Sequence, residues 1–90
     1  MPKKRLLEFY GTECKFCIKM APLVEKLEKE GVKIEKFEVW HNSKNQKLQK
    51  QYDAGFCGGV PFFINTETGE WICGAVSYDE FKKWALGKKK

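Results

Sequence analysis

Two predicted strands that enclose one amphipathic helix constrain the fold of this chain more than any other feature. Residues 4–10, KRLLEFY, form a nearly continuous apolar run, which is typical of a strand covered on both faces. Residues 15–30 repeat apolar side chains at three- and four-residue spacing, which predicts a helix, and residues 32–39 alternate apolar and charged side chains, which predicts a strand. Such a unit joins two parallel strands by a right-handed crossover.

The second half of the chain predicts a hairpin between two further helices. Ser43-x-x-Gln46 is a capping-box pattern that opens a helix to about Tyr52. Residues 61–65 and 70–73 read as antiparallel strands joined by a turn, and a second capping box, Ser77-x-x-Glu80, opens the last helix. We therefore expect an α/β fold of order β-α-β-α-β-β-α, with a four-stranded mixed sheet and helices on both faces.

Length and charge set limits on the class of protein. Ninety residues predict one domain spanning residues 1–90, with flexible basic ends at 1–3 and 87–90. The net charge is +5, but the sequence has no known nucleic-acid module and no apolar run near the ~20 residues of a membrane helix. The apolar stretch after the basic start is interrupted by Glu8 and is too short for a signal-peptide core. We expect a cytoplasmic monomer that binds neither nucleic acid nor membrane.

Cys14 and Cys17 are the residues that most clearly indicate chemistry. Cys14 falls just before the predicted first helix, whose unpaired N–H groups and dipole stabilise a thiolate. Such a position can lower a cysteine pKa from roughly 8.5 toward about 3.5–7.5. Cys17 lies one turn later, so we expect Cys14 to be the exposed attacking thiolate and Cys17 the more buried resolving thiol. Two core thiols, or half of a metal site completed by Cys57 and Cys73, are the alternatives.

Several motifs resemble the thioredoxin family over nearly all 90 residues, although the size is closer to that of a glutaredoxin. The Cys14-x-x-Cys17 pair follows the first strand, and the run KMAP at 19–22 is similar to the thioredoxin segment after the second cysteine. Val60-Pro61 matches the cis-proline position of the family, and Gly74 matches its glycine after the last strand. The resemblance implies a thioredoxin-like fold and thiol–disulfide exchange.

The same resemblance implies roles for two further residues. Glu8 stands where thioredoxins carry a buried acid, and it would accept the proton of Cys17 when the mixed disulfide resolves. Burial would raise its pKa toward neutrality. Lys36 falls where the family places a lysine paired with that acid. The expected catalytic residues are therefore Cys14, Cys17, Glu8 and Lys36.

The chain also departs from both families around the cysteine pair. Glu13 precedes Cys14 where thioredoxins usually have tryptophan, and Lys15-Phe16 replaces both the Gly-Pro of thioredoxins and the Pro-Tyr of glutaredoxins. Residues 59–61 and 73–77 lack the usual glutathione-holding segments of glutaredoxins, which weakens a glutathione site. The expected substrate contacts are Glu13, Phe16, Val60, Pro61, Cys73 and Gly74, with Tyr10 and Trp40 completing an apolar collar.

The resulting hypothesis is an enzyme that reduces protein disulfides and is recycled by a disulfide reductase or a small thiol, without an organic cofactor or metal. The alternatives are a glutathione-dependent glutaredoxin-like enzyme and a cysteine-rich metal-binding or metal-delivery module. The sequence leaves the role of Cys57 and Cys73 open: they are either small hydrophobic residues near the core, a second redox pair or metal ligands. His41 is expected to be an exposed loop residue. The aromatic side chains expected in the core are Phe9, Phe37, Phe62, Phe63, Trp71, Phe81 and Trp84.

Overall fold

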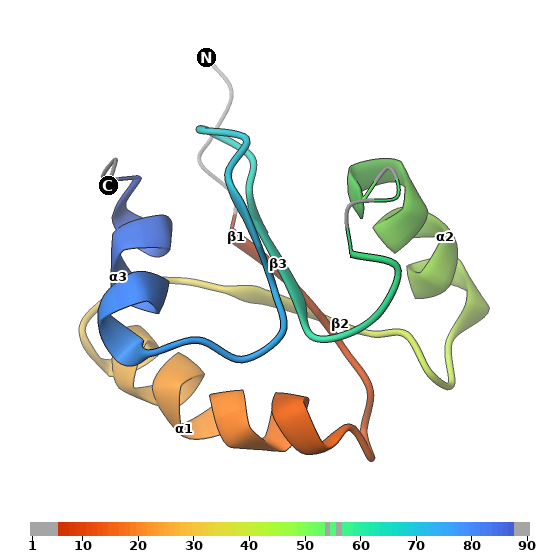
Figure 1. The fold of residues 1–90 in the computed structure, drawn as a ribbon, viewed down its shortest axis with the longest axis horizontal. Helices are drawn as coiled ribbons and strands as arrows, with labels where there is room; N and C mark the ends of the chain where they lie inside the picture. The colour runs from red at the N-terminus through yellow and green to blue at the C-terminus, as the bar shows by residue number, and fades with distance from the viewer. Residues whose placement is uncertain (1–5, 54, 56, 88–90) are drawn as a thin grey trace.

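The computed structural model describes residues 6–53, 55 and 57–87 of the chain. Its seven elements follow the predicted order (Figure 1). They are β1 (Leu6–Tyr10), α1 (Lys15–Lys29), β2 (Glu35–Glu38), α2 (Ser43–Asp53), β3 (Phe62–Asn65), β4 (Trp71–Cys73) and α3 (Tyr78–Leu86). The expected strand start at 4–5 and the expected flexible ends at 1–3 and 88–90 lie outside the described residues. Gly87, which was expected in the flexible end, is instead the left-handed C-cap of α3.

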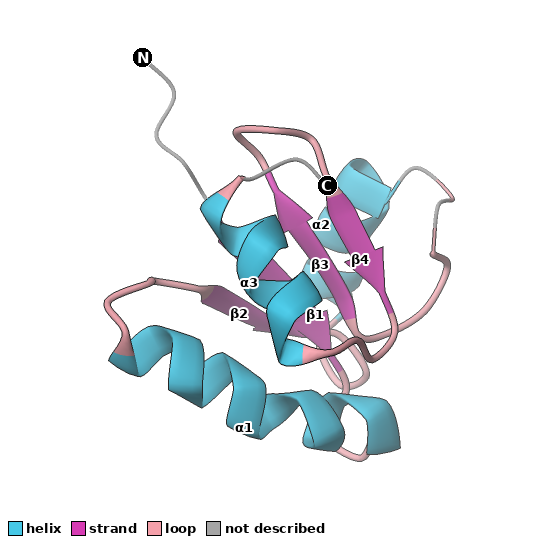
Figure 2. Ribbon diagram, turned by 60° about the vertical axis from the view of Figure 1, so that its left-hand side comes forward, coloured by secondary structure: helices cyan, strands magenta, loops and turns pink. Residues whose placement is uncertain are grey.

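The four strands form one mixed sheet in the order β2-β1-β3-β4. β1 pairs in parallel with β2 and antiparallel with β3, and β3 pairs antiparallel with β4. Helices α1 and α3 cover one face of the sheet and α2 covers the other (Figures 1 and 2). The predicted fold class is confirmed. Within the described residues, no helix is both long and apolar enough to cross a membrane.

Alternation along β1 divides the core between the two faces of the sheet. Leu6 joins the cluster under α1 and α3, whereas Leu7 and Phe9 join the cluster on the α2 face. Glu8 shares the face of Leu6, so its carboxylate enters the layer beneath α1. The fully or nearly buried side chains of the α1/α3 cluster are Leu6, Met20, Val24, Leu27, Ile34, Phe63, Phe81, Trp84 and Ala85.

The second strand is shorter than its alternation predicts. Residues 32–39 were expected, but β2 is only Glu35–Glu38. The reason is the end of α1: the Val32 N–H donates to the Leu27 carbonyl, at 3.3 Å, and Gly31 has a φ of 98°. These residues complete the helix terminus, so the chain reaches the sheet later.

The cap of α2 lies one residue before the predicted one. Asn42, rather than Ser43, accepts the Asn45 N–H through its side chain, at 3.2 Å, and the Gln46 N–H through its carbonyl, at 3.1 Å. Gln46 does not close a capping box but donates to the Val39 carbonyl, at 2.6 Å. Asn and Ser are both favourable N-cap residues. The Gln46 side chain, which would complete a capping box with Ser43, binds the Val39 carbonyl instead, and Asn42 serves as the N-cap.

Two aromatic side chains expected in the core are not buried. Trp71 is 40% exposed and Phe37 is half-buried. Both lie on edge strands, β4 and β2, where a side chain has a neighbouring strand on one side only. The Trp71 ring lies 6.4 Å from the Phe62 ring, and the Phe37 ring lies 5.4 Å from the Phe9 ring.

Asn65 at the end of β3 supplies a testable feature of the fold. Its side chain is fully buried, donates to the Trp84 carbonyl at 3.0 Å and accepts the Glu67 N–H at 2.9 Å. Asn65→Ala removes both bonds: the Glu67 N–H loses this acceptor, and the Trp84 carbonyl keeps only the Gly87 N–H among the hydrogen bonds described, so we expect the free energy of unfolding to fall by about 2–4 kcal/mol in urea titrations. The control Glu67→Gln, an exposed change in the same turn, should stay within about 0.5 kcal/mol of the parent. Equal effects of the two substitutions would contradict this assignment.

Candidate active site

Cys14 begins α1 and caps it with its own sulfur. Its backbone lies in the extended region as the N-cap residue, and its Sγ accepts the Cys17 N–H at 3.2 Å. The turn that leads from β1 is closed by the Cys14 N–H, which donates to the Gly11 carbonyl at 3.1 Å. The sulfur therefore lies at the positive end of the helix dipole, next to the unpaired N–H groups of the first turn. The predicted position of Cys14 is therefore confirmed.

The expected difference in exposure between the two cysteines is wrong. Cys14 and Cys17 are both free thiols and each is only 5% exposed. What distinguishes them is hydrogen bonding. Cys14 Sγ accepts the Cys17 N–H at 3.2 Å and donates to the Val60 carbonyl at 3.9 Å, whereas burial, reinforced by the side-chain hydrogen bond with Cys14, raises the pKa of Cys17 to about 12. Cys17 is thus held as a protonated thiol, which suits a residue that needs a base before it can attack.

The segment before β3 lies against Cys14. The Val60-Pro61 peptide bond is cis, and the Val60 carbonyl oxygen lies 3.9 Å from Cys14 Sγ. Gly74 joins the same place, because its N–H donates to the Pro61 carbonyl at 2.9 Å and its φ is 93°. The structure therefore gathers Val60, Pro61 and Gly74 beside the cysteine pair. Their contact with a substrate stays a prediction.

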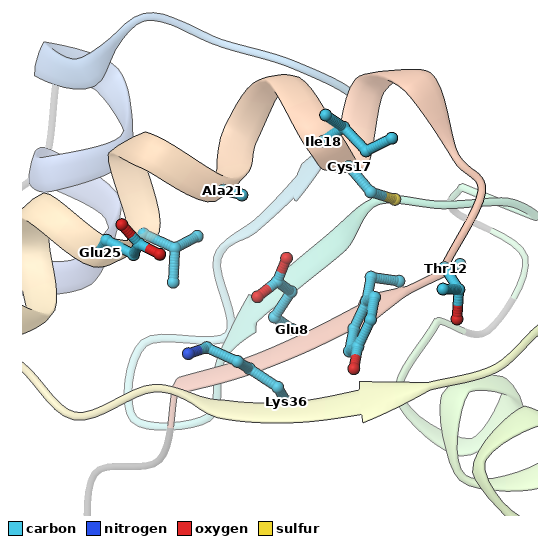
Figure 3. A pocket seen from close by; sticks show the side chains of 10 residues that line it. Glu8, Thr12, Cys17, Ile18, Ala21, Glu25 and Lys36 are labelled. Atoms are coloured by element: carbon cyan, nitrogen blue, oxygen red, sulfur yellow. The ribbon is translucent and has the colours of Figure 1, made fainter.

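Glu8 is buried under α1, only 4% exposed. Burial raises its pKa to about 7; the nearby Lys36 charge partly opposes this rise and the Glu28 charge adds to it. Glu8 and Cys17 line the same cleft, of about 270 Å³, between α1 and the β1–β2 pair. Figure 3 shows Glu8 pointing from β1 toward α1, with Cys17 on the helix and Lys36 on the neighbouring strand. A carboxyl group with this pKa can exchange a proton near neutral pH.

Lys36 does not form the expected ion pair with Glu8. The two residues are partners in the β1–β2 register, but Lys36 Nζ binds Glu28 Oε1 of α1 at 2.9 Å. The Glu28 carboxylate is partly exposed, so the lysine avoids the desolvation that a contact with buried Glu8 would require. Lys36 still lowers the pKa of Glu8 through its charge, and it lines the cleft.

Glu13, next to Cys14, is paired rather than free. His41 Nε2 lies 2.9 Å from Glu13 Oε1, and both side chains are exposed. The hydrogen bond to Glu13 and the charge of Glu13 raise the pKa of His41. The prediction of an exposed loop histidine is confirmed, but the sequence did not predict its partner. A protonated His41 offsets the Glu13 charge that we expected to oppose thiolate formation at Cys14.

Glu38 and Trp40 make contacts at the site that the sequence did not predict. The Glu38 carboxylate accepts the Thr12 N–H and the Trp40 N–H, each at 3.1 Å, and thereby ties the β1–α1 turn to the β2–α2 loop. The Trp40 ring lies on Gly11: a Cβ at Gly11 would fall 2.3 Å from a ring carbon. Nothing in the sequence pattern signals this contact, because its residues belong to different loops.

Exposed apolar side chains accompany the cysteine pair. Phe16 and Ile18 on the first turn of α1 are 57% and 61% exposed, and Trp40 is 47% exposed. Tyr10, the other expected member of the collar, is half-buried and lines the cleft. The collar stays a prediction as a substrate surface.

Cys57 and Cys73 form a disulfide, with their Cα atoms 5.5 Å apart. The interpretation of these residues as separate small hydrophobes is therefore wrong. In the oxidised state they offer no thiolate for a four-cysteine metal site, and the described residues contain no cluster of three or more His, Cys, Asp or Glu side chains able to hold a metal ion. Cys73 is exposed and immediately precedes Gly74.

A mixed sheet with α1 and α3 on one face and α2 on the other, a cysteine pair at the start of α1 and a cis-proline beside it together define a thioredoxin-like fold. No protein-family model matches the chain, and no curated protein matches it. Among solved structures, the chain is similar to the C-terminal domain of DsbD from Neisseria meningitidis in the oxidised form, with a TM-score of 0.61 and 23% sequence identity. The match covers 97% of this chain and 81% of that one.

The buried Glu8 carboxyl predicts a specific dependence of stability on pH. Its pKa is about 7 in the folded chain and about 4.3 in an unfolded one, so its contribution to stability is complete below about pH 4 and is lost as pH rises through 7. Glu8→Gln cannot ionise. We therefore expect the free energy of unfolding of the variant, relative to the parent, to rise by up to about 3 kcal/mol between pH 4 and pH 8 in urea titrations. Parallel pH profiles would show that Glu8 titrates normally.

The contact between Gly11 and Trp40 predicts an energetic coupling. Gly11→Ala should destabilise the chain by about 1–3 kcal/mol, because the added methyl group overlaps the Trp40 ring. In a Trp40→Ala background the same change should cost at least about 1 kcal/mol less. Chemical unfolding of the parent, the two single variants and the double variant completes this cycle. Additive effects would contradict the contact.

Proposed function

We propose that the chain is a thiol–disulfide oxidoreductase that reduces protein disulfides through Cys14 and Cys17. The observation that carries this proposal is the position of Cys14 Sγ, which accepts the Cys17 N–H at the start of α1 and lies 3.9 Å from the Val60 carbonyl. This arrangement combines a cysteine sulfur at a helix N-terminus, a second thiol one turn away and a backbone edge against which an extended peptide can bind. The oxidised form recorded for the similar DsbD domain is consistent with redox chemistry on this fold.

The reaction proceeds by two exchanges. The Cys14 thiolate attacks one sulfur of the substrate disulfide, which forms a mixed disulfide and releases the other substrate sulfur as a thiolate. Cys17 then loses its proton to the Glu8 carboxylate, directly or through water in the shared cleft, and attacks Cys14 Sγ. The second substrate sulfur leaves, and the Cys14–Cys17 disulfide holds the oxidation. Two electrons have moved from the chain to the substrate.

Glu8 suits the second exchange because of its pKa. With a pKa of about 7, a substantial fraction of the carboxyl group is ionised at neutral pH and can accept a proton, and it returns that proton readily. Lys36 acts on this step through its charge, which keeps the pKa of Glu8 from rising further.

The surroundings of Cys14 favour protein substrates. Phe16 and Trp40 expose apolar rings near the cysteine pair, and Val60 and Gly74 present backbone beside it. We further propose that the chain works as a cytoplasmic monomer and that a disulfide reductase or a small thiol restores Cys14 and Cys17. The glutathione-dependent alternative has no specific observation in its favour.

Substitution of the two cysteines tests the mechanism. With insulin as a generic disulfide substrate and dithiothreitol as the donor, we expect Cys14→Ser to reduce the rate over the dithiothreitol background by more than about a thousandfold, because the nucleophile is lost. Cys17→Ser should instead accumulate a mixed disulfide on Cys14, visible by mass spectrometry. The control Cys57→Ser/Cys73→Ser should retain the Cys14-dependent reaction. A Cys14→Ser variant as active as the parent would refute the proposal.

Replacement of Glu8 separates its role from that of the nucleophile. Glu8→Gln should leave formation of the mixed disulfide nearly unchanged and slow its resolution by about tenfold to a hundredfold, since a general base contributes on this scale or more. Rapid quenching of single turnovers, followed by mass spectrometry, measures both steps. Equal slowing of the two steps would point to a structural effect instead.

A further inference from the structure

The Cys57–Cys73 disulfide lies close in sequence to Val60 and Gly74 but belongs to neither exchange described above. Cys57 precedes Val60 by three residues, and Cys73 directly precedes Gly74. Cys73 also pairs with Phe62 across β3 and β4, next to cis-Pro61. The disulfide thus joins the segment that leads to Val60 with the segment that leads to Gly74.

Two buried side chains of α2 hold the Cys57 segment without help from sulfur. The Asp53 carboxylate accepts the Cys57 N–H at 2.6 Å and the Gly58 N–H at 2.8 Å. Gln49 donates to the Gly59 carbonyl at 2.8 Å. Asp53 is 4% exposed and Gln49 is 9% exposed, so the side-chain partner of each bond is buried, and the bonds themselves are partly buried. The segment therefore keeps its place when the disulfide opens.

The Cys73 segment is also held by backbone hydrogen bonds. β4 pairs with β3, and the Gly74 N–H donates to the Pro61 carbonyl at 2.9 Å. With both backbones fixed, the two sulfurs remain neighbours after reduction and can pair again. The Gly59 carbonyl lies 3.5 Å from Cys57 Sγ and can accept a hydrogen bond from the Cys57 thiol that reduction creates. Because hydrogen bonds hold both backbone segments in addition to the disulfide, the disulfide is suited to reversible opening.

The two sulfurs differ in access. Cys73 is exposed on β4, an edge strand, whereas Cys57 is half-buried. A thiolate from solvent therefore reaches Cys73 first, and Cys57 is the leaving sulfur.

We propose that Cys57 and Cys73 form a second thiol–disulfide exchange site, which reacts with thiols at Cys73 and works independently of Cys14 and Cys17. A thiolate attacks Cys73 Sγ; the Cys57–Cys73 bond breaks, a mixed disulfide forms on Cys73, and Cys57 leaves as a thiolate that takes a proton from water. A second molecule of the same thiol attacks the mixed disulfide, releasing the oxidised thiol and a Cys73 thiolate, which is protonated in turn. Two thiols are oxidised to one disulfide as the protein disulfide is reduced.

A titration with a small thiol tests reversibility. Cys14→Ser/Cys17→Ser removes the first pair, so any exchange belongs to the second one and the outcome does not depend on the proposed function. Across graded ratios of reduced to oxidised glutathione, followed by alkylation and mass spectrometry, we expect the Cys57–Cys73 disulfide to open and reform along one curve while circular dichroism stays that of the folded chain. Opening that occurs only on unfolding would overturn the proposal and make the disulfide a structural staple. Peptide mapping of the unsubstituted chain across the same series repeats the test without substitutions.

Single cysteines test the direction of attack. In the same background, Cys57→Ser leaves Cys73 alone and Cys73→Ser leaves Cys57 alone. We expect the lone Cys73 to form a mixed disulfide with oxidised glutathione at least about tenfold faster than the lone Cys57, since exchange rates depend on access. Faster reaction at Cys57 would overturn the assignment of Cys73 as the attacked sulfur.

Asp53 is proposed as a positioning residue for this site, and its replacement tests the scaffold. Asp53→Asn weakens the hydrogen bonds that hold the Cys57 segment, so the equilibrium constant for disulfide formation against glutathione should fall by about fivefold or more. Asp79→Asn, an exposed aspartate on α3, is the matched control and should leave that constant unchanged. A residue with only a general structural role would lower the unfolding free energy without moving the constant in the folded chain, and that result would contradict the positioning role.

Discussion

The hydrogen bond from the Cys17 N–H to Cys14 Sγ connects the local folding of α1 with the chemistry proposed for the chain. A helix needs a side chain to satisfy its first N–H groups, and here a sulfur serves as the cap. The helix N-terminus also places unpaired N–H groups and the positive end of the helix dipole beside that sulfur, which belongs to the residue proposed as the nucleophile. Because β1 leads directly into the turn before α1, the position of the sheet determines where Cys14 lies. The cis-Val60-Pro61 segment before β3 contacts Cys14 Sγ.

Burial of Glu8 is the second constraint, and it opposes stability. A carboxyl group beneath α1 gains no ion pair from its register partner Lys36, which binds Glu28 instead. The cost appears as a pKa of about 7, which is the property that a proton acceptor for Cys17 requires. Glu8 and Cys17 line the same cleft. A well-packed apolar residue at position 8 would avoid this cost but would lack the carboxyl group that we propose as the base.

The opposite side of the site depends on buried polar side chains of α2. Asp53 and Gln49 hold residues 57–59 by their backbone, and this loop leads directly to Val60 and Pro61. The segment that faces Cys14 therefore rests on α2 as well as on β3. The Cys57–Cys73 disulfide adds a covalent link between this loop and β4, where hydrogen bonds also hold both segments.

The sequence by itself determined the order of the elements, the parallel β1–β2 pair, the hairpin, the start of α1 at Cys14 and the burial of Glu8 that its resemblance implied. Apart from the burial of Glu8, which the resemblance implied, these features follow from apolar periodicity and local turn chemistry, which act between residues close in the chain. Only the tertiary structure decided that Lys36 binds Glu28, that Trp40 covers Gly11, that His41 meets Glu13 and that Cys57 pairs with Cys73. Each of these contacts joins residues from different elements or loops, so it depends on how the elements pack and on which partner costs least to desolvate.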